Sequence, residues 1–252
     1  MIEIRQLHKS FGKQNVLNGV DILIPQGQTT VILGTSGGGK SVLLKHIIGL
    51  LRPERGEIRI DGIDITRLKG KDLNEMRKKF GMLFQEAALF DSMNVGDNVA
   101  FPLREHTKLK EVDIRSIVAQ KLEQVELPGV EEKMPSELSG GMKRRVGLAR
   151  ALALDPEIVL FDEPTSGLDP LLAEAIEELI IETHRRLGRT FVVITHDIHT
   201  AFHIAHKIAM LHEGRIVEEG SPGAFRRSLN PVVQAFLARD EHKEEKNERR
   251  QG

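Results

Sequence analysis

Three nearly continuous apolar runs alternate with helical patterns along the chain. The runs cover residues 29–33, 158–161 and 190–194, are rich in β-branched side chains and are bounded by polar residues. Runs of this kind are typical of strands that are buried on both faces of a parallel sheet. A weaker run covers residues 79–84, and apolar residues recur at helical spacing over 114–125 and 172–180. This alternation predicts an α/β fold in which helices cover a mainly parallel sheet.

Two other regions have a different pattern. Residues 1–7, 20–24 and 57–61 are short, charged and alternating, which predicts an antiparallel sheet at the edge of the core. Residues from about 86 to 155 show helical patterns and little strand signal, so we expect a helical insertion between two halves of the core. Residues 240–252 are almost all charged or polar, which is typical of a solvated tail.

Composition narrows the classes of function. The chain has 36 Lys and Arg against 37 Asp and Glu, and this balance argues against binding nucleic acid through a basic surface. It has no Cys, which excludes disulfides, thiolate catalysis and Cys-ligated metal centres. No apolar stretch approaches the length of a membrane span, and no secretory signal is visible. We therefore expect a cytoplasmic protein whose membrane role, if it has one, comes through a partner.

A glycine-rich segment between an expected strand and an expected helix matches the phosphate-binding pattern G-x-x-x-x-G-K-[ST]. It comprises Gly34, Thr35, Ser36, Gly37, Gly38, Gly39, Lys40 and Ser41. Glycines let backbone N–H groups approach a polyphosphate, and the following helix N-terminus adds a positive dipole end. Lys40 is expected to reach the β- and γ-phosphates, and Ser41 is expected to bind Mg²⁺.

Polar residues follow two of the buried runs. Asp162 and Glu163 come at the end of the second run, and His196 follows the third. An Asp-Glu pair alone is more often a strand entering a loop, but beside a phosphate loop Asp162 is expected to bind Mg²⁺ and Glu163 to deprotonate the attacking water. His196 is expected at the same edge of the sheet, near the γ-phosphate. Further histidines up to residue 206 are better explained by a polar helix face than by a metal site.

The segment Leu138–Met142, with the sequence LSGGM, stands about 20 residues before the Asp-Glu pair. This order of motifs resembles the ATP-binding-cassette (ABC) ATPases over residues 2–221. The resemblance implies a P-loop NTPase fold with a RecA-like parallel-sheet core, an antiparallel β-subdomain and an inserted helical subdomain. Residues 1–86 and 156–239 would form the core and 87–155 the helical subdomain.

The same resemblance implies roles for further residues. Phe11 would stack on adenine, Gln85 of the Q-loop would sense Mg²⁺, water and the membrane partner, and His196 would be the switch histidine. Asp169 would belong to the D-loop, which runs from Ser166. Val42 stands where the family commonly has a second hydroxyl residue, so one phosphate contact is expected to be lost, and Met142 replaces a common Gln.

In ABC proteins the signature segment completes the site of a facing subunit. The resemblance therefore implies a head-to-tail homodimer in which Ser139, Gly140 and Gly141 contact the ATP held by the other chain. ATP would join the two chains and hydrolysis would release them.

The segment from residue 84 to 104 resembles the ATPases of MCE/Mla-type phospholipid transporters, through the string ALF-x-x-M-x-V-x-x-NVA-x-PLRE. This implies a permease in the membrane, an MCE-domain lipid-binding protein and a location at the cytoplasmic face of the inner membrane. Leu89, Phe90, Met93 and Val95 either form a groove for the permease or pack in the helical subdomain. Two alternatives stay open: the ATPase of another importer, for example for amino acids, and a non-transport ABC protein such as a cell-division regulator.

Overall fold

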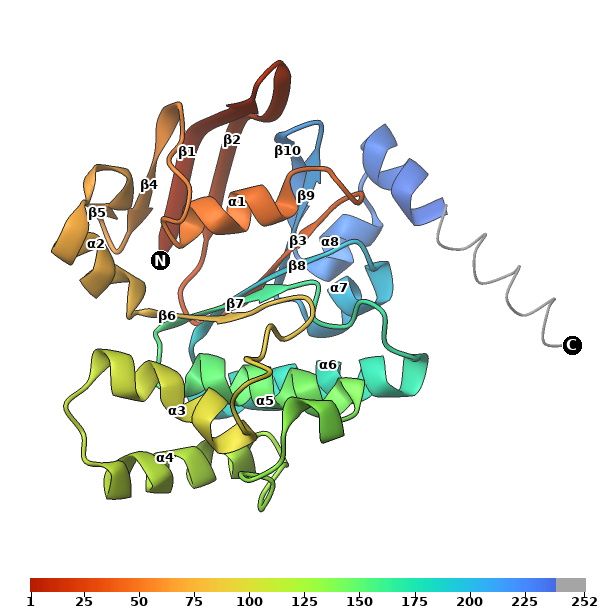
Figure 1. Ribbon diagram of the computed structural model, residues 1–252. Coiled ribbons are helices and arrows are strands. Elements are labelled where there is room, and N and C mark those ends of the chain that lie inside the picture. Colours follow the sequence, from red (N-terminus) through yellow and green to blue (C-terminus); the bar gives the residue numbers. More distant parts are fainter. Residues whose placement is uncertain (239–252) are drawn as a thin grey trace, which may run out of the picture.

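A six-stranded sheet forms the centre of the structure, a computed structural model that describes residues 1–238 (Figure 1). The strands lie in the order β10-β9-β3-β8-β7-β6, and all neighbours are parallel except β10 and β9. They are β3 (Thr29–Leu33), β6 (Phe80–Leu83), β7 (Ile158–Asp162), β8 (Thr190–Thr195), β9 (Lys207–His212) and β10 (Arg215–Gly220). The four predicted strands are confirmed, and every residue of β3, β6 and β8 is buried.

Burial on both faces follows from the alternation of side chains along each strand. In β7, Ile158 and Leu160 pack in one apolar cluster, whereas Val159 and Phe161 pack in the other. The first cluster also contains α1 (Lys40–Ile47) and the apolar face of a second sheet. The second cluster contains the helices on the opposite face. The central sheet therefore separates two cores, as expected for an α/β protein.

The second sheet is antiparallel, as the charged and alternating segments predict. Its order is β2-β1-β4-β5, with β1 (Ile2–Phe11), β2 (Gln14–Ile24), β4 (Arg55–Ile60) and β5 (Ile63–Asp64). A short 3₁₀ turn, Ile65–Arg67, and α2 (Gly70–Arg77) lead from this sheet back to β6. In Figure 1 this sheet lies on the side of the central sheet opposite to α3, α4 and α5.

Residues 86–155 contain helices, turns and loops and no strand, in agreement with the predicted helical insertion. The elements are α3 (Val95–His106), α4 (Glu111–Gln124), a 3₁₀ turn at Pro135–Glu137 and α5 (Gly140–Leu152). Two glycines let α5 lie directly against β6. A Cβ added at Gly81 would come within 2.1 Å of the Ala151 carbonyl oxygen, and one at Gly147 within 2.7 Å of Leu83.

The labelled helices that follow are α6 (Pro170–Leu187), α7 (Ile198–Ile204) and α8 (Pro222–Arg226), and residues 231–238 are also helical. Each of the three labelled helices begins at a residue whose side-chain oxygen accepts a backbone N–H: Asp169, Asp197 and Ser221 respectively. This is the usual way to satisfy the free N–H groups of a first helical turn. Within residues 1–238, none of the helices has the length and apolar character that crossing a membrane requires. The predicted tail at 240–252 lies outside the described residues.

Candidate nucleotide-binding and hydrolysis site

The glycine-rich loop connects the end of β3 to the start of α1. Two of its glycines are required by their surroundings. A Cβ at Gly34 would lie 2.5 Å from the Leu211 carbonyl oxygen, and Gly39, with φ of 97°, precedes the first residue of α1. Positive φ and close backbone approach both favour glycine. The loop therefore presents backbone and a helix N-terminus at the carboxyl edge of the sheet, as a phosphate site requires.

Lys40 is held at the centre of this loop and is only 5% exposed. Its ammonium donates to the carbonyl oxygens of Gly34, at 2.9 Å, and Thr35, at 3.1 Å. It also lies 3.2 Å from Oε1 of Glu163. A buried ammonium needs such partners because burial penalises its charge. The phosphate-loop cation and the expected catalytic carboxylate are thus in direct contact.

Ser41 and Asp162 meet as the sequence predicts for a magnesium pair. The Ser41 hydroxyl donates to Oδ1 of Asp162 at 3.1 Å. Burial raises the pKa of Asp162 above its usual value, although the bond from Ser41 acts in the opposite direction. A carboxylate that is penalised by burial gains stability from a nearby cation. A hydroxyl and a carboxylate oxygen are also ligands that Mg²⁺ prefers.

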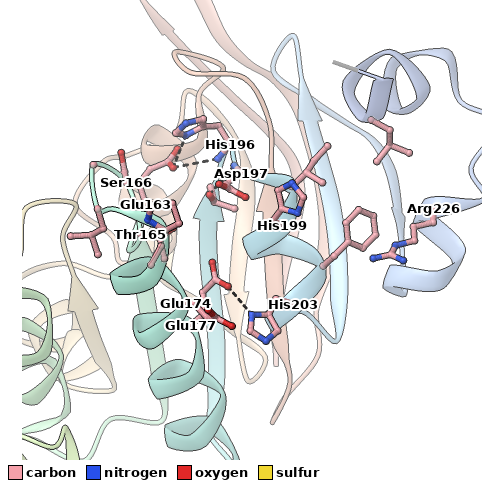
Figure 2. Close-up of a pocket in the computed structure, with 18 residues that line it drawn as sticks. Glu163, Thr165, Ser166, Glu174, Glu177, His196, Asp197, His199, His203 and Arg226 are labelled. Carbon is pink, nitrogen blue, oxygen red and sulfur yellow. Dashed lines mark hydrogen bonds and ion pairs between the residues drawn. The ribbon is translucent and has the colours of Figure 1, made fainter. Parts of the chain in front are cut away.

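Glu163 and His196 come together because their strands are neighbours. Asp162 in β7 pairs with Ile194 in β8, which places the residues after both strands at one edge. Nδ1 of His196 lies 2.8 Å from Oε2 of Glu163, and the His196 backbone N–H donates to the same oxygen at 3.3 Å (Figure 2). Glu163 adopts a φ of 49°, which is uncommon for a residue with a side chain. The loop geometry therefore aims this carboxylate at both His196 and Lys40.

Gln85 lies across the same opening. Its amide donates to the Ser166 hydroxyl at 3.4 Å. The residues gathered at this edge line an open cavity of about 420 Å³. They are Val16, Ser36, Gly37, Gly39, Lys40, Ser41, Val42, Gln85, Glu163, Ser166 and His196. The structure thus brings most of the predicted site residues together, and it adds Val16, which the sequence did not indicate.

The other predicted contacts do not line this cavity. Phe11 is 48% exposed at the end of β1, below the ammonium of Lys9. Ser139 caps α5 by accepting the Met142 N–H, and the glycines after it lie beside the D-loop of the same chain: a Cβ at Gly140 would lie 3.4 Å from Leu168. Asp169 caps α6. Their roles as nucleotide contacts stay predictions.

Two arginines of α5 support the loops of the site and were not predicted. Arg144 is 8% exposed and donates to the carbonyl oxygens of Pro164 and Ser166, both at 3.1 Å. Arg150 donates to the carbonyl oxygens of Ala87 and Ala88, two residues with positive φ after Gln85. In the sequence, Arg144 stands in the basic run 143–145 after LSGGM, which does not indicate where its side chain points, and Arg150 lies outside that run.

A second cavity, of about 630 Å³, is an apolar groove with a basic rim. Its lining includes Phe84, Phe90, Phe101, Pro102 and Arg150. Of the four residues predicted to line a groove here, only Phe90 does so. Val95 is fully buried in the core because it faces the same side of α3 as Val99, and Leu89 packs against that core. The alternative of core packing is therefore correct for Val95 and Leu89.

Comparison with known proteins identifies the family. The sequence profile of the family described as ABC transporter matches residues 17–166. The chain belongs to the ABC transporter family. The match runs through the phosphate loop, the LSGGM segment and the Asp-Glu pair, so the predicted P-loop fold and ATPase class are confirmed.

Relatives extend this assignment over almost the whole chain. The probable ribonucleotide transport ATP-binding protein Mkl of Mycobacterium leprae is 50% identical over 94% of this chain and 68% of its own length. The intermembrane phospholipid transport system ATP-binding protein MlaF is 44% identical in Haemophilus influenzae and 43% identical in Escherichia coli K12. These two matches cover 94% of this chain and 90% and 88% of MlaF. The resemblance to phospholipid-transport ATPases is thereby confirmed.

Solved structures agree with the fold. The ATP-binding cassette MJ0796, as a dimer in a post-hydrolysis state with ADP and Pi, has a TM-score of 0.80 and 33% identity, and the match covers 88% of this chain and 99% of that one. CbiO1 of Clostridium perfringens, part of the ABC transporter complex cbiONQ, has a TM-score of 0.81 and 29% identity, with 95% and 98% covered. The chain is thus an ABC ATPase with one cassette.

Proposed function

We propose that this chain is the ATP-hydrolysing subunit of an ABC transporter that moves phospholipid between membranes. The observation that supports the hydrolytic part best is the convergence of Lys40, Ser41, Asp162, Glu163 and His196 at one edge of the sheet. For the chain as a whole we propose the division into residues 1–86, 87–155 and 156–239 given above.

The proposed chemistry assigns one task to each group. Lys40 binds the β- and γ-phosphates of the substrate ATP, where it shares its charge with Glu163. Ser41 and Asp162, with Gln85, hold Mg²⁺, which neutralises phosphate charge when it is bound. Glu163 orients and deprotonates the attacking water as general base. His196 donates a hydrogen bond to Glu163 or to the γ-phosphate, and its contact of 2.8 Å with Glu163 keeps both groups at the site.

We further propose that two copies complete each other's site. Ser139, Gly140 and Gly141 stand at the N-terminus of α5, away from the cavity of their own chain. A helix N-terminus with free N–H groups suits the γ-phosphate of an ATP held by a second copy. Phe11 would stack on its adenine, and Asp169 would stand at the same interface. The dimeric state of MJ0796 supports this arrangement.

The groove beside α3 and α5 is the proposed docking place of the permease. Phe84 and Phe90 are 38% and 41% exposed in it, which is unusual for large apolar side chains. Its rim carries Arg77, Lys78, His106 and Arg150 and no acidic residue. An apolar segment with a carboxylate fits these surroundings. The permease would keep the chain at the cytoplasmic face of the inner membrane.

The cargo is proposed from the relatives, whose names differ. MlaF is matched over nearly its whole length, whereas a third of Mkl lies beyond the match. The string after Gln85 also favours the phospholipid systems. We therefore propose phospholipid as cargo and an MCE-domain lipid-binding protein as a further partner.

The test is to purify the chain with its membrane partners and reconstitute them in vesicles. We expect ATP-dependent transfer of labelled phospholipid, absent in the Glu163→Gln complex, and an MCE-domain protein among the partners. ATP-dependent uptake of ribonucleotides or amino acids without lipid transfer would contradict the cargo. A chain that forms no membrane complex would contradict the transport function.

A further inference from the structure

A chain of buried polar side chains lies behind the hydrolytic site and takes no part in the roles proposed above. Thr165, Glu177 and Thr200 are 8%, 7% and 2% exposed. Oγ1 of Thr165 lies 3.2 Å from Oγ1 of Thr200, and the Thr200 hydroxyl donates to Oε1 of Glu177. Thr165 lies in the loop after β7 and Glu177 in α6, as Figure 2 shows, and Thr200 belongs to α7. Buried polar groups are costly without partners, so this chain fixes how the three segments meet.

The direction of these hydrogen bonds follows from the number of donors. A threonine hydroxyl has one hydrogen, and that of Thr200 is donated to Glu177. The Thr165 hydroxyl must therefore donate to Thr200. The Glu177 carboxylate, which can only accept, therefore sets the direction of both hydrogen bonds. Removal of Glu177 would leave the Thr200 hydroxyl without its acceptor, and removal of the Thr200 hydroxyl would leave both Thr165 and Glu177 without this partner.

Glu177 also contacts a histidine of α7. Its Oε2 lies 2.7 Å from Nδ1 of His203, and Nε2 of His203 lies 3.1 Å from Oε1 of Glu178. The hydrogen bond to Glu177 raises the pKa of His203 above its usual value. Glu177, His203 and Arg226 of α8 line a further cavity, where the Arg226 guanidinium lies 4.4 Å from the centre of the Phe202 ring. The imidazole therefore lies between two carboxylates, which favours its cationic form.

Two members of this hydrogen-bond chain, Thr165 and Thr200, lie close in sequence to the hydrolytic residues. Thr165 comes two residues after Glu163. The Thr200 backbone N–H donates to Oδ1 of Asp197 at 3.0 Å, and Asp197 follows His196 directly. The loops of Glu163 and His196 are thus joined twice. The first connection is the contact between the Glu163 and His196 side chains at the site, and the second is the buried Thr165–Thr200–Glu177 chain of hydrogen bonds.

We propose that Glu177 is a positioning residue for ATP hydrolysis, which holds the Glu163 loop against the start of α7 through Thr200 and Thr165. The proposal rests on the roles given above to Glu163 and His196. A general base must stay within hydrogen-bond reach of its water, and misplacement by about 1 Å can cost about 100-fold in rate. ATP binding depends on the phosphate loop, to which none of Thr165, Thr200 and Glu177 makes a hydrogen bond. Breaking the Thr165–Thr200–Glu177 hydrogen bonds therefore lowers kcat and leaves the affinity for ATP unchanged.

The test compares Thr200→Val with Thr200→Ser in the full chain. Valine keeps the shape and removes the hydroxyl, whereas serine keeps the hydroxyl. We expect Thr200→Val and Glu177→Leu, which removes both acceptor oxygens, to lower kcat by about tenfold or more with the ATP Kd, measured by calorimetry, within about twofold of wild type. Thr200→Ser should retain most of the wild-type kcat. The matched control is Glu174→Gln, which removes the same charge from an exposed position one turn earlier in α6 and should leave kcat unchanged.

A kcat within about twofold of wild type in Thr200→Val and Glu177→Leu would overturn the proposal, given the expected loss of about tenfold. An equal loss in Thr200→Ser would overturn it as well, because the hydroxyl would then not be the cause. Thr165→Val breaks the chain at its other end and serves if Thr200→Val does not fold. Glu163→Gln is measured alongside: wild-type turnover in that variant would overturn the role of Glu163 itself, whereas loss there with normal Thr200→Val would overturn the positioning role alone.

Discussion

Glu163→Gln is expected to change ATP hydrolysis and ATP affinity in opposite directions. The substitution keeps the size of the side chain and one acceptor oxygen but removes the charge. Because the carboxylate is the proposed base, turnover at saturating ATP should fall by about 10²- to 10⁴-fold. Lys40 keeps its bonds to the carbonyl oxygens of Gly34 and Thr35, so the phosphate loop should keep its shape.

The gain in affinity follows from the ion pair between Lys40 and Glu163. At 3.2 Å the gross Coulomb attraction is about 5 kcal/mol for an effective dielectric constant of about 20. Most of this is offset by desolvation of the two ions. What glutamine loses is the difference between a charge-assisted and a neutral hydrogen bond, about 1 kcal/mol. Phosphates that bind Lys40 no longer compete with a carboxylate, so the ATP Kd should fall by roughly fivefold.

Calorimetry is the suitable binding assay because the chain has no Trp. Phosphate release at saturating Mg-ATP gives turnover, and Glu174→Gln is the control for loss of one negative charge. Weaker ATP binding in Glu163→Gln would refute the competition for Lys40. Turnover within about tenfold of wild type would refute the role of Glu163 as base.

Four further outcomes are expected. Lys40→Ala should raise the ATP Kd by roughly 10- to 150-fold in calorimetry, from the loss of a charge-assisted contact of about 1.5–3 kcal/mol; an unchanged Kd would contradict the phosphate site. Phe11→Ala should weaken ATP binding by about 1–3 kcal/mol, a figure taken from base stacking, without abolishing turnover, and an equal Kd would remove Phe11 from the site. Asp162→Asn should abolish hydrolysis yet raise the melting temperature at neutral pH. The pKa of Asp162 is higher in the folded than in the unfolded state, so the folded state loses stability as pH rises from the unfolded to the folded pKa, and asparagine removes this loss. A lower melting temperature in Asp162→Asn would contradict this reasoning. Glu163→Gln should form dimers with Mg-ATP in light scattering, alone or on the permease. The double variant Glu163→Gln with Ser139→Trp, which blocks the signature segment, should stay monomeric. Dimers of both variants would argue against a site shared between two chains.

The parallel core could be predicted because its strands are apolar on both faces. The pair β9 and β10 was not predicted. The apolar run of β9, residues 208–211, is as long as that of β7 but has only one β-branched residue, and β10 is a half-exposed edge strand with the sequence RIVEEG. Its pairing comes from the neighbouring strand and not from its own pattern. The strand order likewise depends on contacts between distant segments, which one sequence does not specify.

The site could be predicted as far as its motifs reach. The phosphate loop and the residues after β7 and β8 meet as expected because parallel strands end at one edge. The contact of Lys40 with Glu163, the burial of Arg144 and the bonds of Arg150 to the loop after Gln85 were not predictable, since nothing in a single sequence distinguishes these arginines from the other basic residues. Val95 was within reach: Val95, Val99 and Leu103 recur at helical spacing, which marks the buried face of α3.

Because α5 packs closely on β6, a movement at this contact is transmitted along the whole length of α5. Gly81 and Gly147 leave no room between the two elements, and Ala151 lies at the contact. β6 runs directly into the loop of Gln85, so a tilt at this contact moves the whole helix. The contact and the signature glycine Gly140 are about 16 Å apart along the helix axis, so a rotation of about 5° shifts the far end by about 1.4 Å. Such a shift exceeds the range of distances over which a hydrogen bond survives. Small angular changes at one end of α5 are therefore enough to make or break contacts at the other.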